Sequence, residues 1–395
     1  MESQTETPNS VRMQRRELVD GGTSELYLTV APRPAVDLQT QAREVYMAIR
    51  KELTETGAKI FGERMFATAE AMPVVKAIRD AVIGEFDDGV PPTCIVITRS
   101  PIGGVFSGAQ IHAIRSDDSP TVLHCCNVTE GGLSAREFAS NGHRWLYING
   151  LSRGPGSNQC PAAQGELTEA EQARRMFFCA GCFLRQYGAS MQSVPRTWLW
   201  LKDICDWYDD LNQVRRDFFI AEHLIDPVRR TTHLPASTGI GLYGADGAAC
   251  TIDLLALPGR EDEIELIEAG GDQRSAYEYG SAFSRAAMAP MPGGRTMFIS
   301  GTAAIDEEGN TEHIDQVIPQ VDDTIAHIRS LLEDADCDDR HVLTALAYCK
   351  TPAVERAFRE RWGDLGWPRL IMVGDVCRPD LLFEVELTAS PDLAV

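Results

Sequence analysis

The fold is decided by five segments that follow one another near the end of the chain: QVDDTIAHIRSLLEDADC (320–337), VLTALAYCK (342–350), TPAVERAFRERWGDL (351–365), WPRLIMVGDV (367–376) and DLLFEVELTAS (380–390). The first and third segments carry apolar residues at spacings of three and four, which predicts amphipathic helices. The other three are apolar or alternating runs bounded by turn residues, which predicts strands. The predicted order is therefore helix, strand, helix, strand, strand.

This order of elements occurs twice more along the chain. One copy consists of QAREVYMAIRKELTETGA (41–58), GERMFATA (62–69), MPVVKAIRDAVIGEF (72–86), PPTCIVIT (91–98) and GAQIHAIRS (108–116), and the other of residues 171–190, RTWLWLK (196–202), ICDWYDDLNQVRRDFF (204–219), LPASTGIGLYG (234–244) and GAACTIDLLAL (247–257). Such self-similarity is the signature of repeated structural units. We predict an α+β fold of three tandem units, in which two helices per unit pack on one face of a mixed sheet.

The borders of the units follow from the strands that open them. RWLYING (144–150) parallels RTMFISG (295–301), and each is an apolar strand that stops at a glycine, whereas the first copy has only the short ELYLTV (25–30). We therefore place boundaries near residues 119 and 259. The predicted division is a disordered tail (1–22), a degenerate first unit (23–118), a second unit (119–258) and a third unit (259–395).

Composition and charge exclude several classes of partner. The 395 residues are 44% hydrophobic and 24% charged, which is typical of a globular protein. The formal charge of −21 repels nucleic acids and anionic membranes, and an anionic substrate would require arginines gathered locally. No apolar run approaches the roughly 20 residues that span a bilayer, and the polar residues 1–22 lack the apolar core of a signal peptide. We expect a soluble, cytoplasmic protein without nucleic-acid or membrane partners.

The cysteine, histidine and glycine patterns do not suggest disulfides, metals or cofactors. The eleven cysteines are odd in number and irregularly spaced, unlike a disulfide framework. The single CxxC, from Cys179 to Cys182, lacks the second ligand pair of a zinc site. No two histidines flank a carboxylate at a spacing of four, and SRGPGSNQ (152–159) has neither the P-loop lysine nor the Rossmann glycine spacing. We predict no metal and no cofactor.

The second and third units carry a resemblance to a known family. LYINGL (146–151), the strand and helix RTWLWLKDICDWYDDLNQVRRDFF (196–219) and the alternating acids near the end of the chain are similar to the Rid, or YjgF-like, family of reactive-intermediate deaminases. Members of this family are small homotrimers with active sites between neighbouring subunits. The resemblance implies that three such units in one chain form an intramolecular pseudo-trimer, which acts as a monomer or dimerises through another face.

Four separated motifs carry a narrower resemblance. LPASTGIG (234–241), YGSAFSRA (279–286), ISGTAAID (299–306) and GDVCRPDLLFEVE (374–386) resemble motifs of the chorismatases, which are large relatives of the Rid proteins. The likeness covers roughly residues 90–390, with GIGLYG standing where GIGG is more usual. It implies an enzyme of secondary metabolism that releases pyruvate from chorismate, a small anionic substrate.

One acid distinguishes the third unit from the other two. Aligned by their alternation, the three closing strands place Gln110, Thr251 and Glu384 at equivalent points, and only the last has a carboxyl group. If catalysis requires an acid at this position, only one of the three equivalent sites can be active. The resemblance implies that Glu384 protonates the methylene carbon of the enolpyruvyl ether and so generates an oxocarbenium ion. A glutamate suits this role only when burial raises its pKa.

Two residues of the motifs imply different products. Cys377 resembles the chorismatases that form 3-hydroxybenzoate by internal rearrangement, and Ala286 resembles the hydrolytic type that forms a dihydroxycyclohexadiene carboxylate. A buried thiol that only packs is an equally good interpretation of Cys377. Both products therefore stay open.

Arginines are the second requirement, because chorismate has two carboxylates and a guanidinium binds a carboxylate bidentately. Arg285 and Arg378 lie within the matched motifs, and Arg369, a weaker candidate, begins the penultimate strand. We predict that these arginines bind the substrate. Thr238 and Tyr279 are candidate hydrogen-bond donors in the same cleft, and a role in the core or in a turn fits them equally well.

Two other functions fit the same sequence. A Rid-type deaminase of enamines or imines would need a carboxylate-binding arginine and a positioned water. A metabolite-binding or scaffold protein would have kept the fold and lost the chemistry. Pyruvate release from chorismate, ammonia release from 2-iminopropanoate and binding without turnover distinguish the three functions.

Overall fold

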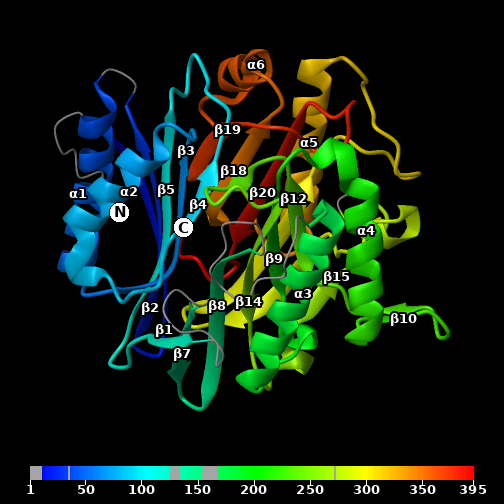
Figure 1. The fold of residues 1–395 in the computed structure, drawn as a ribbon, viewed down its shortest axis with the longest axis horizontal. Coiled ribbons are helices and arrows are strands. Elements are labelled where there is room, and N and C mark those ends of the chain that lie inside the picture. The colour runs from blue at the N-terminus through cyan, green and yellow to red at the C-terminus, as the bar shows by residue number, and fades with distance from the viewer. Residues whose placement is uncertain (1–10, 34–35, 125–133, 153–166, 271–272) are drawn as a thin grey trace.

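The computed structural model describes residues 11–33, 36–124, 134–152, 167–270 and 273–395. Residues 1–10 of the predicted tail and most of the SRGPGSNQ segment lie outside these ranges. The described chain forms three six-stranded sheets, a two-stranded ribbon and six α-helices. Figure 1 shows the helices on the outside of the molecule and the strands between them. This is the predicted α+β architecture.

The first sheet belongs almost entirely to the first unit. Its order is β1–β2–β5–β3–β4–β13, and α1 (Leu38–Thr56) and α2 (Met72–Ile83) cover one face. The strands are β1 (Val11–Asp20), β2 (Thr23–Pro32), β3 (Lys59–Ala67), β4 (Thr93–Val96), β5 (Phe106–Arg115) and, from further along the chain, β13 (Tyr243–Gly244). The predicted disordered tail of residues 1–22 is wrong over residues 11–20, which pair with β2 along their whole length. The β1 sequence is mostly polar and lacks the alternation that identifies a half-buried strand.

The second sheet has the order β12–β9–β14–β8–β7–β6 and is covered by α3 (Glu169–Gln186) and α4 (Ile204–Ala221). Its strands are β6 (Thr121–His124), β7 (Ser134–Ser140), β8 (His143–Ser152), β9 (Arg196–Leu201), β12 (Ala236–Ile240) and β14 (Cys250–Ala256). The ribbon of β10 (Ile225–Asp226) and β11 (Thr231–Thr232) follows α4.

The third sheet has the order β15–β16–β17–β20–β18–β19 and is covered by α5 (Val317–Glu333) and α6 (Pro352–Trp362). Its strands are β15 (Glu265–Ile267), β16 (Ala286–Met291), β17 (Gly294–Thr302), β18 (Val342–Cys349), β19 (Arg369–Val373) and β20 (Phe383–Ala389). Short 3₁₀ turns along the chain are η1 (Gly84–Phe86), η2 (Met191–Ser193), η3 (Glu261–Glu263), η4 (Ala276–Tyr279) and η5 (Asp339–His341).

The three units share one topology. In each, the two strands that flank the second helix are parallel, namely β3 with β4, β9 with β12, and β18 with β19. The closing strand, which is β5, β14 or β20, runs antiparallel to the first strand of that pair. The repeat predicted from the order of elements is therefore confirmed. The boundaries near residues 119 and 259 stay a prediction.

Several helix boundaries follow capping signals in the sequence. Thr168 and Glu171 form a capping box at the start of α3. The Thr351 side chain caps α6, whose first turn contains Pro352, and Gly57, at φ +72°, ends α1. None of the helices in the described ranges combines the length and apolarity that a bilayer span requires.

Each sheet has two buried faces. The outer face packs on the helices of its own unit and forms a separate core. The inner faces of the three sheets share a further core, to which Phe66, Trp145, Trp200, Phe298 and Tyr348 belong. Full burial of one large apolar side chain stabilises a fold by roughly 1.5–3 kcal/mol. The shared core therefore joins the three units strongly.

The units meet head to tail around this shared core. β4 of the first unit contacts β8 of the second, β12 of the second contacts β17 of the third, and β19 of the third contacts β5 of the first. Such a cyclic arrangement uses the same kind of interface three times and closes on itself. The chain is thus an intramolecular pseudo-trimer.

The assembly state follows from this ring. Because three units close it within one chain, further trimerisation is not needed. We expect light scattering to give the mass of one chain, 43.4 kDa, or twice that mass if chains pair through another face. A stable trimer of the full chain would contradict the covalent pseudo-trimer.

Candidate active site

A pocket of about 480 Å³ lies where the second unit meets the third. It contains five of the eight predicted site residues: Glu384, Cys377, Arg285, Arg378 and Tyr279. The remaining lining residues are Tyr208, Arg215, Ser237, Gly239, Ser281, Phe283, Gly301, Ala303, Ile305 and Leu381. They come from α4 and β12 of the second unit, from β17 and β20 of the third, and from the segments before β16 and β20.

Glu384 lies on β20, and only 4% of its surface is exposed. Its carboxyl group fits beside β17 because Gly301 has no side chain. A Cβ atom at Gly301 would overlap the Glu384 Oε1 atom. This close approach explains why the strand RTMFISG stops at a glycine. A second close contact, in which the Gly241 amide donates to the Asp375 carbonyl at 2.8 Å, holds the second unit against the third.

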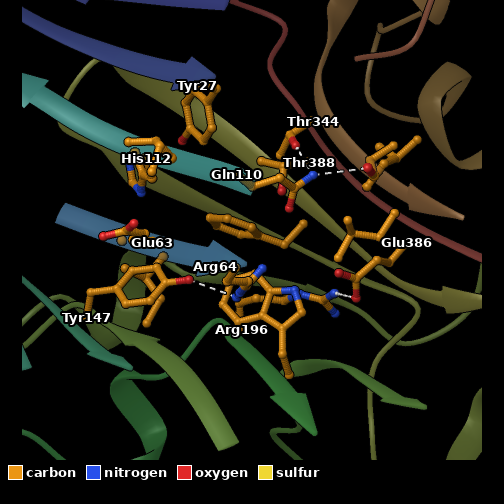
Figure 2. A pocket seen from close by; sticks show the side chains of 18 residues that line it. Tyr27, Glu63, Arg64, Gln110, His112, Tyr147, Arg196, Thr344, Glu386 and Thr388 are labelled. Atoms are coloured by element: carbon orange, nitrogen blue, oxygen red, sulfur yellow. Dashed lines mark hydrogen bonds and ion pairs between the residues drawn. The ribbon is translucent and has the colours of Figure 1, made fainter. Parts of the chain in front are cut away.

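The charge state of Glu384 depends on its neighbour on the same strand face, Glu386. Arg196 of β9 pairs with Glu386 at 2.6 Å, and both side chains are almost fully buried (Figure 2). Burial is the main cause that raises the pKa of Glu384 to about 8, and the charge of Glu386 adds to it. Arg196 and Arg378 act in the opposite direction. At neutral pH the Glu384 carboxyl group is therefore mostly protonated and can donate a proton.

Two buried arginines face this acid without a carboxylate partner. Arg285 and Arg215 are each 2% exposed, and neither forms an ion pair with any described residue. Arg285 donates from Nε to the Arg274 carbonyl at 3.0 Å, and its Nη2 atom has no hydrogen-bond partner. Arg215 donates from Nη2 to Asn212 at 2.7 Å, and its Nε atom has none. Such unsatisfied buried donors are costly and favour an anionic ligand.

Arg378 and Tyr279 are two further polar residues that line the pocket. Arg378 donates to the Gly309 carbonyl at 2.6 Å and lies over the Tyr279 ring, 5.5 Å from its centroid. The guanidinium of Arg285 is equally close to that ring. Three arginines therefore surround one neutral acid, and the pocket attracts anions although the whole chain carries a charge of −21.

The thiol of Cys377 lies in the same pocket, next to Tyr208. Burial is the main cause that raises its pKa to about 12, followed by the charge of Glu384. The group is therefore a neutral thiol at physiological pH and not a thiolate nucleophile. Burial likewise raises the pKa of Tyr208.

Three predicted site residues lie outside the pocket. Arg369 donates to the carbonyls of Trp362, Gly363 and Leu365, so it closes the C-terminal end of α6. Its substrate-binding role stays a prediction. Ala286 is fully buried in the core of the third unit.

Thr238 forms part of the wall behind the pocket. Its hydroxyl accepts a hydrogen bond from Arg196 Nη2 at 2.7 Å, and its methyl group lies beside Gly301. The residue supports the Arg196–Glu386 ion pair and is not among the lining residues. Its predicted role as a hydrogen-bond donor to a substrate stays a prediction.

A solved structure of a chorismatase superposes on 97% of this chain and on 100% of its own, with a TM-score of 0.58 and 17% sequence identity. The chain has the chorismatase fold. Smaller structures match about a third of it: a YjgF-family protein from Neisseria meningitidis (20% identity, 32% of this chain and 93% of its own, TM-score 0.25) and a Rid-family protein from Yersinia pestis (16% identity, 32% and 98%, TM-score 0.26). No family model and no curated protein sequence matches the chain.

Sequence reasoning missed two lining residues, Tyr208 and Arg215. Both lie on α4, and their spacing of seven residues places them on one face of that helix. This spacing is a signal in the sequence, but it does not reveal which partner the face contacts. Only the packing of α4 beside the third unit of this chorismatase fold brings the two side chains to Glu384.

The other two interfaces of the ring are closed by internal hydrogen bonds. At the first, β14 carries Thr251 at the position of Glu384, and nearby Asp253 accepts hydrogen bonds from Arg64 and Thr93, each at 2.7 Å. The Gly150 amide donates to the same carboxylate at 2.7 Å. Protein groups thus satisfy the Asp253 carboxylate, whereas the buried Thr251 hydroxyl has no hydrogen-bond partner.

At the interface between the third unit and the first, Gln110 holds the equivalent position. It donates to Thr344 Oγ1 at 2.6 Å and to the Ala345 carbonyl at 3.1 Å. This side chain is neutral and fully engaged. The acid in a substrate-sized pocket with unpaired arginines therefore belongs to the interface between the second and third units.

One group of potential metal ligands occurs among the described residues. Glu312, Asp323 and His327 offer atoms within 4.8 Å of one another beside α5. These residues are partly exposed and do not line the pocket around Glu384.

The raised pKa of Glu384 makes a prediction about stability. The unfolded carboxyl group ionises near its ordinary pKa of 4.5, whereas the folded one holds its proton up to about pH 8. Stability from this group is therefore present below pH 4.5 and is lost as pH rises through 8, at about 1.4 kcal/mol per pKa unit. We expect the free energy of unfolding of Glu384→Gln, relative to wild type, to increase between about pH 5 and 8.

Urea unfolding at a series of pH values measures this difference. The glutamine is neutral at every pH, so the difference should level off above the folded pKa. A difference that stays constant across the series would show that the carboxyl group titrates normally.

Proposed function

We propose that this chain is a chorismatase-like enzyme, which cleaves the enolpyruvyl ether of chorismate and releases pyruvate. The observation that carries the proposal is a buried, protonated Glu384 in a pocket with three arginines that have no carboxylate partner. The chorismatase fold supports it. The product is 3-hydroxybenzoate or a dihydroxycyclohexadiene carboxylate.

The geometry suits a dicarboxylate that needs a proton. Arg285, Arg215 and Arg378 provide more than enough positive charge for the two carboxylates of chorismate, and the free donors of Arg285 and Arg215 become satisfied on binding. Binding at several points holds the enolpyruvyl group against Glu384, which lowers the entropy cost of the chemical step.

The reaction begins when Glu384 donates its proton to the methylene carbon of the enolpyruvyl group. That carbon becomes a methyl group, and the ether carbon becomes an oxocarbenium ion beside the new Glu384 carboxylate. In the hydrolytic course, water adds to the cation and returns a proton to Glu384, and the hemiketal then separates into pyruvate and the ring alcohol. In the alternative course, an internal nucleophile of the substrate replaces the water.

The charge of Glu386 assists this cycle. It disfavours a second negative charge on the same strand face, so it keeps Glu384 protonated before substrate binds. The cation that develops next to Glu384 then compensates the charge that the acid acquires. The cation thus offsets part of the repulsion that arises between the two carboxylates as Glu384 loses its proton.

The test of the acid is the change Glu384→Gln. Glutamine keeps the shape and the hydrogen bonding but has no transferable proton, so we expect pyruvate release from chorismate to fall by about 10²-fold or more. A coupled lactate dehydrogenase assay measures the rate. Thr251→Val is the matched control, because Thr251 occupies the equivalent point on β14 and should leave the rate unchanged.

Similar losses in both variants, or full activity in Glu384→Gln, would contradict the one-acid mechanism. Binding of chorismate to Glu384→Gln, measured by calorimetry, should persist because the three arginines remain. A wild-type protein that binds chorismate without releasing pyruvate would instead support a non-catalytic function. Ammonia release from 2-iminopropanoate would support a deaminase.

The neutral thiol of Cys377 makes a prediction about products. If the thiol excludes water from the oxocarbenium ion, wild type forms 3-hydroxybenzoate, and Cys377→Ala shifts the ratio towards the cyclohexadiene acid because the smaller side chain admits water. Liquid chromatography with mass detection measures the ratio. Binding should change little, since Arg285 and Arg378 are intact. An unchanged ratio in an active variant would mean that the thiol only packs.

A further inference from the structure

A second cavity lies at the centre of the ring, apart from the pocket around Glu384. Its volume is about 610 Å³, and its lining residues come from all three units. Figure 2 shows these side chains directed towards one another from the inner faces of the sheets. The cavity shares no lining residue with the Glu384 pocket.

Aromatic rings form much of the wall of this central cavity. Tyr27 stacks on His112 with a centroid distance of 4.6 Å, and Tyr147 stacks on Trp198 at 6.1 Å. The third unit contributes Phe298. Aromatic walls of this kind favour a planar, apolar ligand, because aromatic rings pack well against one another face to face or edge to face.

One cation in this wall has unused hydrogen-bonding capacity. Arg196 is 1% exposed, and its Nη2 atom donates to Thr238 and to Glu386. Its Nε and Nη1 atoms have no partner. A buried N–H group without a partner costs free energy, which a ligand oxygen in the cavity would recover.

The other charged groups of the wall are matched by protein partners. Arg64 donates to Asp253 and to the Tyr147 hydroxyl, each at 2.7 Å, and Glu63 pairs with Arg79 at 2.6 Å. The free donors of Arg196 therefore determine which polar group of a ligand the cavity would bind. Guanidinium N–H groups bind oxyanions more strongly than neutral acceptors.

We propose that the central cavity is a second ligand site, which binds a small aromatic carboxylate. The carboxylate accepts hydrogen bonds from the free donors of Arg196, and the ring lies among Tyr147, Trp198 and Phe298. The empty volume of about 610 Å³ includes space that is open to solvent. This site does not depend on the reaction proposed for Glu384.

Crystals soaked with 3-bromobenzoate test the location. The anomalous signal of bromine identifies the ring without model bias, and we expect a peak in the central cavity close to Arg196. A bromine peak only in the Glu384 pocket, or no peak in either cavity, would overturn the proposal. In the latter case the cavity holds water alone.

Calorimetry with 3-bromobenzoate tests whether Arg196 binds the carboxylate. Removing Arg196 alone would leave Glu386 buried without a partner, so the variant is the double change Arg196→Met with Glu386→Leu, an apolar pair of similar volume. We expect it to weaken binding at least tenfold. Arg285→Met is the matched control, since it removes a buried arginine from the other pocket and should leave central binding within twofold of wild type.

A single variant covers the case in which the double change does not fold. Thr388 also lines the central cavity, and Thr388→Leu adds bulk there without touching an ion pair. It should weaken binding of 3-bromobenzoate as well. Unchanged affinity in every folded cavity variant, or loss in Arg285→Met alone, would overturn the proposal. Pyruvate release from chorismate is a separate measurement, so either proposal can fail without the other.

Discussion

The buried ion pair between Arg196 and Glu386 is the interaction on which both cavities depend. It joins β9 of the second sheet to β20 of the third, and both side chains are almost inaccessible to water. A buried carboxylate needs such a partner, because an unpaired charge in a protein core is very unfavourable. Once Glu386 is ionised and paired, Glu384 on the same strand face experiences its charge. The charge of Glu386 adds to the burial that raises the pKa of Glu384, whereas Arg196 acts in the opposite direction.

The three interfaces of the ring have the same backbone geometry and different polar chemistry. The first is joined by Arg64 and Asp253, the second by Arg196 and Glu386, and the third by the neutral Gln110 with Thr344. In a trimer of identical chains any change occurs three times. A single chain with three units escapes this constraint, so its interfaces can differ. The one between the second and third units holds the buried acid Glu384 and arginines without a carboxylate partner.

The sequence was sufficient for the parts of this structure that depend on local patterns. Helix and strand periodicity predicted the three units, and the alternation of the closing strands singled out Glu384. The hairpin strand β1 was not predicted, because its residues are mostly polar. The carbonyl contacts of Arg369 could not be predicted, because a guanidinium that satisfies backbone carbonyls of α6 has the same sequence signature as one that binds a ligand. Arg215 was not predicted, because whether it lines the pocket depends on which unit α4 packs against.

Arg196 also connects the two cavities energetically. Its guanidinium lines the central cavity, while Thr238 and Glu386, which accept from it, lie behind the wall of the Glu384 pocket. A carboxylate bound to Arg196 would add negative charge near Glu386 and draw on the cation that now compensates it. The pKa of Glu384 would then rise further, and a dianionic substrate nearby would bind less well. Because such coupling is reciprocal, the substrate would weaken the central ligand by the same factor.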